Sequence, residues 1–179
     1  MYFSYGDERF YFNDSKIVLG LFSYRKGWLL YTPLMFLSIF GLMIGKVDWF
    51  KKYRIGILTL MSLIIFITFS WWSWFYGGSF GCRPLIDFYA LFAISIAAFL
   101  TYLFKQKKAV KLASFAIISI LIVFSLFQNL QYKNGLIHYS DMTKEAYWMH
   151  FLETKPQPGF YESLDNIDND ALQKGERDI

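Results

Sequence analysis

The chain has 179 residues, of which 55% are hydrophobic, 22% are aromatic and only 18% are charged. Soluble domains carry about 25% charged residues, so this composition argues against an ordinary soluble protein. The single cysteine, Cys82, excludes an internal disulfide framework and a cysteine-rich metal site. The net charge of +4 comes largely from lysines between apolar runs, a pattern that indicates membrane topology and not nucleic-acid binding.

Four apolar runs follow residues 1–26, at about 27–45, 55–74, 85–104 and 112–130. Each is close to the roughly 20 residues with which a helix crosses the hydrocarbon core. Helices satisfy their own backbone hydrogen bonds, which lipid cannot do. The sequence therefore predicts an all-α, multi-pass membrane protein with about four transmembrane helices over residues 27–130. In the first run, Thr32 followed by Pro33 allows a later start, with a helix from Pro33 to Trp49.

The short loop between the first and second apolar runs and the short loop between the third and fourth are both rich in lysine. KVDWFKKYR covers residues 46–54, and KQKKAVK covers residues 105–111. Short lysine-rich loops stay in the cytoplasm, so residues 1–26 and the tail at 131–179 are expected to be extracytoplasmic. The pattern favours the cytoplasmic (inner) membrane. Residues 1–26 contain no signal peptide, and we expect the chain to be the C-terminal part of a longer polytopic protein.

The tail carries nine acidic and five basic residues from Gln131 onward. Ser140 or Asp141 is a candidate N-cap for a short helix, whose apolar face is formed by Met142, Ala146, Met149 and Phe151. Two prolines and a glycine in LETKPQPGFY interrupt it, and residues 161–175 favour a second short helix. The tail is thus expected to be a small, ordered helical structure outside the membrane.

The most unusual stretch is WWSWFYGGSFGCRPLIDFYA, residues 71–90. Its three tryptophans are typical of an aromatic belt at the membrane interface. Arg83 and Asp87 are four residues apart, so on one helix turn they can neutralise each other. Alternatively, Arg83 binds a phosphate at the outer leaflet and Asp87 orients it.

Three segments resemble polytopic glycosyltransferases of the GT-C class, the group related to dolichyl-phosphate-mannose protein mannosyltransferases and to bacterial enzymes using undecaprenyl-phosphate sugars. GGSFGCRPLIDFYA resembles their G-x-S-x-G-x-R-x-L element. LFSYRKGWLLYTPLMFLSIFGL, residues 21–42, resembles the preceding segment, and QYKNGLIHYSDMTKEAYW is similar to the C-terminal end of some members. The resemblance implies transfer of a sugar from a lipid-phosphate carrier to an acceptor at the outer face.

The resemblance also implies roles for residues. Arg83, with Asp87, is the best candidate for holding the carrier phosphate, and Arg25 and Lys26 form a second basic site that snorkelling anchors explain equally well. For Tyr31 and Trp74, stacking on a sugar competes with a place in the aromatic belt. The family's catalytic base lies in a first outer loop that no part of this chain matches, so no catalytic residue is assigned.

Other polar residues have simpler interpretations. Asp7 and Glu8 form a carboxylate pair, but they lie just before a motif from late in the family's sequence and are expected to be solvated. His138 and His150 lack metal-ligand spacing and are expected to be ordinary residues of the outer face. We expect no metal and no cofactor.

Two hypotheses remain for function. In the first, the chain is the non-catalytic C-terminal part of a glycosyltransferase; its partners are membrane lipid, a polyprenyl-phosphate sugar and an N-terminal half supplied as a separate chain. In the second, it is a stand-alone four-span membrane protein that acts as an assembly or binding module, with Arg83 and Asp87 paired. A transporter is less favoured, because no charged residue lies at mid-span.

Overall fold

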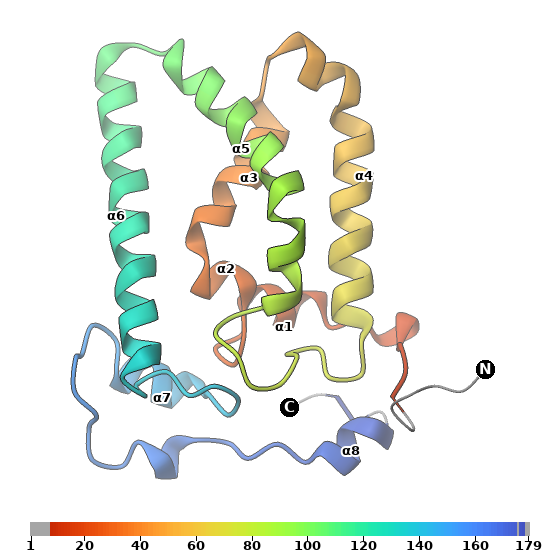
Figure 1. Ribbon diagram of the computed structural model, residues 1–179, viewed down its shortest axis with the longest axis vertical. Helices are drawn as coiled ribbons and strands as arrows, with labels where there is room; N and C mark the ends of the chain where they lie inside the picture. The colour runs from red at the N-terminus through yellow and green to blue at the C-terminus, as the bar shows by residue number, and fades with distance from the viewer. Residues whose placement is uncertain (1–7, 175, 178–179) are drawn as a thin grey trace.

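The protein is an all-α, multi-pass membrane protein. A computed structural model describes residues 8–174, 176 and 177 (Figure 1). The helical elements, with 3₁₀ helices labelled η, are η1 (Phe12–Asp14), α1 (Ile17–Phe22), α2 (Trp28–Tyr31), η2 (Pro33–Met35), α3 (Phe36–Ile44), α4 (Asp48–Ser70), η3 (Arg83–Phe88), α5 (Tyr89–Phe104), α6 (Lys108–Lys133), α7 (Lys144–Met149), η4 (Tyr161–Ser163) and α8 (Asn169–Lys174).

Three of these helical stretches are long and apolar enough to cross a membrane. They are α4, the continuous stretch Arg83–Phe104 formed by η3 and α5, and α6. Both α4 and α6 begin inside the lysine-rich loops, several residues before the predicted starts. Lysines and arginines at helix ends can extend to the interface while their stems cover apolar surface, so such residues do not end a helix.

The first predicted span is not one continuous helix. It is divided into α2, η2 and α3, and the apolar helical part that remains is only Pro33–Ile44. Pro33 has no backbone N–H and disfavours the helical conformation at Thr32, whose φ is −135°. The Thr32 side chain makes no capping hydrogen bond, and the helix stops at Ile44, before Trp49. The predicted later start at Pro33 is therefore confirmed, whereas the continuous helix over 27–45, the Thr32 cap and the continuation to Trp49 were wrong.

Small residues let α3 and α5 approach each other closely. A Cβ atom added at Gly41 would lie 1.8 Å from the carbonyl oxygen of Ser95, and one added at Gly45 would lie 3.0 Å from Cβ of Ala98. Gly41 and Gly45 are spaced as in the G-x-x-x-G pattern of packed membrane helices. This contact fixes the short helix α3 against a membrane-spanning neighbour.

The two ends of the bundle differ in character. The loops before α4 and before α6 lie together at one end, which we call the lysine-rich end (Figure 1). Residues 8–26, the loop after α4 and residues 134–174 gather at the opposite end, which we call the tail-side end (Figure 1). The arrangement matches an up-down bundle, and the assignment of the lysine-rich end to the cytoplasm remains a prediction.

The tail packs as folded structure. The first tail helix, α7, is capped by Thr143, whose hydroxyl accepts a hydrogen bond from the Ala146 amide at 3.1 Å. The predicted caps, Ser140 and Asp141, were thus placed a few residues too early. Residues 161–175 contain the short helix α8, as expected, preceded by the 3₁₀ turn η4.

Candidate binding site at the tail-side end

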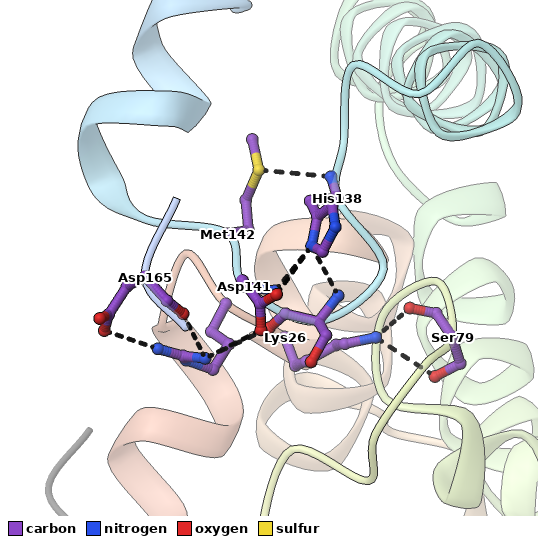
Figure 2. Close-up of polar contacts among 8 residues, drawn as sticks. Lys26, Ser79, His138, Asp141, Met142 and Asp165 are labelled. Atoms are coloured by element: carbon purple, nitrogen blue, oxygen red, sulfur yellow. Dashed lines mark hydrogen bonds and ion pairs between the residues drawn. The ribbon is translucent and has the colours of Figure 1, made fainter. Parts of the chain in front are cut away.

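Arg25 joins three segments at the tail-side end. It lies between α1 and α2 and is only 6% exposed. Its Nη2 is 2.9 Å from the Asp165 carboxylate, and its Nη1 is 3.9 Å from that of Asp141 (Figure 2). The guanidinium also lies over the ring of Phe75, 5.6 Å from the centroid. Burial lowers the pKa of Arg25, and the two carboxylates oppose that effect.

Lys26 is also turned inward. It is 2% exposed, and its ammonium group donates to the carbonyl oxygen of Ser79 and lies 3.4 Å from the Ser79 hydroxyl (Figure 2). Burial lowers its pKa to about 8, while interactions with Cys82 and Asp141 act in the opposite direction. Arg25 and Lys26 are therefore buried in contacts with the protein, and neither is a free headgroup-binding cation.

His138 and Asp141 form a tight turn before α7. Nδ1 of His138 accepts hydrogen bonds from the amides of Ser140 and Asp141, at 3.3 and 2.9 Å (Figure 2). Nδ1 also lies 3.5 Å from the Asp141 carboxylate, so the ring and the backbone amides together shape the turn that leads into α7.

His150 was expected at the outer surface, but it is buried. It is 1% exposed, and its Nε2 accepts a hydrogen bond from the Gln157 amide at 3.0 Å. Its backbone carbonyl accepts from Gln131 at 2.7 Å. His150 is thus part of the contact between α6 and the tail.

Arg177 fastens the last described part of the tail to α4. It is 1% exposed and donates to the carbonyl oxygens of Phe69, Trp71 and Trp72 at 3.1, 2.8 and 3.3 Å. These carbonyls lie at the C-terminal end of α4, where cations are favoured by the helix dipole. The sequence offers no local signal for this contact, because the partners are more than 100 residues away along the chain.

The tryptophans after α4 do not form an exposed belt. Trp74 is 0% exposed and Trp72 is 9% exposed; both belong to a cluster that includes Phe75 and Leu172 of α8. Trp71 is half-buried and packs edge-on against Phe10, with ring centroids 4.7 Å apart. The aromatic-belt interpretation is therefore wrong for Trp72 and Trp74, which are buried inside the protein, and it stays a prediction for Trp71.

Tyr31, the other predicted stacking residue, is also buried. It is 2% exposed, and its hydroxyl donates to the Tyr24 carbonyl at 2.5 Å. Its ring packs edge-on against those of Phe80 and Tyr147. In this structure neither Tyr31 nor Trp74 presents a free ring face to a ligand.

A cavity of about 520 Å³ opens among these segments. It is lined by Glu8 and by residues from the stretches 71–77, 139–141 and 166–169. Its wall includes the turn at Tyr76 and Gly77, which both have positive φ, 55° and 60°. Such a conformation is strained for tyrosine, and a 2.7 Å hydrogen bond from its hydroxyl to the Thr68 carbonyl helps to hold it. The volume is within the range of small-molecule sites, about 300–1,000 Å³.

Arg83 and Asp87 do not pair. Both side chains are exposed, and no ion pair joins them within the part of the chain that the structure describes. They lie on the 3₁₀ helix η3, where about three residues make a turn and positions four apart point in different directions. The predicted neutralising pair, which assumed α-helical spacing, is therefore not formed, and the Arg83 guanidinium makes no hydrogen bond to the described residues.

The described residues contain no group of three side chains suited to a metal ion. Glu8 is half-buried at the cavity, while Asp7 lies outside the described residues. The chain matches no protein-family model, no curated protein and no solved structure. The function must therefore be inferred from the geometry and from the resemblance of the motifs.

Proposed function

We propose that the chain is the carrier-binding part of a membrane glycosyltransferase, and that it holds a polyprenyl-phosphate sugar at the tail-side end of the bundle. The observation that carries this proposal is the exposed guanidinium of Arg83 at the first residue of a membrane-spanning stretch. An arginine at this level can meet a lipid phosphate with two parallel hydrogen bonds. No described protein group competes for it, since Asp87 does not pair with it.

The rival hypothesis, a stand-alone assembly module, predicts that Arg83 and Asp87 satisfy each other. Arg83 and Asp87 point in different directions on η3 and do not pair, so the rival hypothesis loses the ion pair that it predicts. The transferase proposal further places the tail-side end outside the cytoplasmic membrane, on the strength of the lysine-rich loops at the other end. Its catalytic base is supplied by another part of the enzyme, as the resemblance implies.

The proposal is tested by lipid binding to the purified full chain in detergent. Native mass spectrometry would compare undecaprenyl phosphate with undecaprenol, which has the same tail and no phosphate. We expect preferential binding of the phosphate, and we expect Arg83→Ala to weaken that preference roughly tenfold or more while Arg83→Lys retains part of it.

Arg9→Ala is the matched control, because Arg9 is an exposed arginine whose Nε contacts only the Tyr11 hydroxyl among the hydrogen bonds of the described residues. It should leave the preference unchanged. Equal binding of phosphate and alcohol, or an Arg83→Ala chain that keeps the wild-type preference, would reject the carrier-binding role.

A further inference from the structure

We infer that the 520 Å³ cavity at the tail-side end is a binding site for an uncharged sugar ring. This inference concerns a part of the protein other than Arg83, since Arg83 is not among the residues lining the cavity. It goes beyond carrier binding because it assigns recognition of the sugar itself to residues of the loop after α4 and of the tail.

The aromatic residues of the lining are the first argument. Trp71 and Tyr139 line the cavity, and neither is fully buried; Tyr139 is 54% exposed. The Tyr139 ring packs at a tilt against the neighbouring His138 ring, with centroids 4.3 Å apart, and lies close to Gly78. A partly exposed ring supported in this way is suited to the apolar C–H face of a pyranose, which combines apolar contact with polar edges.

Unsatisfied polar groups are the second argument. Trp72 lines the cavity, and its indole N–H is buried without a hydrogen-bond partner among the described residues. Ser73 and the exposed residues Asn166 and Asn169 also line the cavity, and their side chains make no hydrogen bond within the described chain. Buried polar groups are normally satisfied, so the free Trp72 N–H indicates that this cavity receives a polar occupant. Hydroxyl and amide groups both donate and accept, as the hydroxyls of a sugar require.

The charge of the lining disfavours an anion. No lysine or arginine lines the cavity within the described chain, so a phosphate or carboxylate would find no cationic partner there. Of the two carboxylates among the described lining residues, Asp141 is 3.9 Å from the buried Arg25, which offsets its charge. The other described carboxylate, Glu8, lies among mostly uncharged polar groups and aromatic rings. A neutral polyol therefore fits the cavity better than an anion does, and tetramethylammonium is the probe for the competing cationic ligand that a carboxylate and aromatic rings would favour.

The test is a fluorescence titration of the purified full chain in detergent, because Trp71 and Trp72 line the cavity and report on its occupancy. The probes are methyl glucoside, methyl mannoside and methyl galactoside, with glucose 6-phosphate and tetramethylammonium as the charged comparisons. We expect a saturable change with at least one glycoside. We expect Tyr139→Ala to weaken that affinity roughly tenfold, and Tyr139→Phe to keep most of it, because the ring is retained.

Tyr161→Ala is the matched control, since Tyr161 is 78% exposed on η4 and does not line the cavity. Asn166→Ala is a second cavity variant at an exposed position, where folding is not at risk, and it should weaken binding by roughly two- to tenfold. The inference is overturned if no glycoside gives a saturable change, if Tyr139→Ala binds as tightly as Tyr161→Ala, or if a charged probe binds more tightly than every glycoside. If any of these outcomes overturns the sugar-binding inference while the chain still binds undecaprenyl phosphate, the carrier-binding proposal stands.

Discussion

Removing either partner of the ion pair between Arg25 and Asp165 should loosen the tail, and the exposed partner should matter at least as much as the buried one. Arg25 is 6% exposed, whereas the Asp165 side chain is 55% exposed. Asp165→Asn leaves a buried guanidinium whose remaining carboxylate among the described residues is that of Asp141, at 3.9 Å, together with long hydrogen bonds to the backbone carbonyls of residues 140 and 165 at 3.4 and 3.5 Å. Arg25→Met instead leaves a carboxylate that water can solvate, although it also removes the contact with Phe75.

The magnitude follows from this difference in burial. Breaking a fully buried pair costs about 3–5 kcal/mol, and a surface pair contributes about 0–1 kcal/mol. One partner here is more than half exposed, so we expect about 1–2 kcal/mol for Asp165→Asn, and a similar or smaller loss for Arg25→Met. The double variant should cost less than the sum of the two single variants, since both remove the same interaction.

Hydrogen–deuterium exchange gives a direct readout. The Asp165 amide donates to the Asp141 carbonyl at 3.1 Å, so its exchange reports opening of this part of the tail. A loss of about 1–2 kcal/mol corresponds to roughly five- to thirtyfold faster exchange. Asp170→Asn is the matched control, because Asp170 is exposed and in no ion pair among the described residues. Unchanged exchange in Asp165→Asn, or equal acceleration in the control, would refute the role of Arg25 in holding the tail.

Three further predictions follow from buried groups. The folded-state pKa of Lys26, about 8, is below its ordinary value of 10.5. Between these two pH values the unfolded chain binds more protons than the folded chain, so the free energy of unfolding should rise with pH, by about 3 kcal/mol at most. Thermal melts of Lys26→Met as a function of pH should lack this rise. Gly41→Ala should lower the melting temperature, because its Cβ would meet the Ser95 carbonyl at 1.8 Å, whereas Gly56→Ala, with open space around it, should not. Gln131→Leu removes hydrogen bonds of 2.7 and 2.9 Å to two tail carbonyls and should speed proteolysis of residues 151–159 several-fold.

The long helices were predictable because lipid leaves the backbone few alternatives. Runs such as residues 112–130 are predominantly apolar over a span-length stretch, so hydropathy alone indicates a helix there. The boundaries were less predictable, since α6 continues to Lys133 and begins at Lys108, beyond the apolar run at both ends. Pro33 was recognised as a starting signal, yet its effect on Thr32 divided the first span in a way that composition does not reveal.

The candidate site was less predictable, because its residues meet across long sequence separations. Arg25 and Asp165 are 140 positions apart, and nothing in the local pattern of either residue indicates the other. The cavity likewise combines residues from four segments of the chain. One signal was present: the aromatic and glycine-rich stretch 71–81 contains Tyr76, Gly77 and Gly81, whose positive φ values give the loop its sharp turns.

Burial, and not charge alone, distinguishes the basic residues of the tail-side end. Arg25, Lys26 and Arg177 are each at most 6% exposed and bind carboxylates or backbone carbonyls of the tail and the loops. Their substitution would disturb folding of the whole end, so a loss of activity in such variants would not identify a ligand contact. Arg83 is exposed and its guanidinium makes no hydrogen bond to the described residues, so its substitution can report on a bound phosphate with little structural cost. A functional study of this end should therefore begin with Arg83 and with the exposed ring of Tyr139.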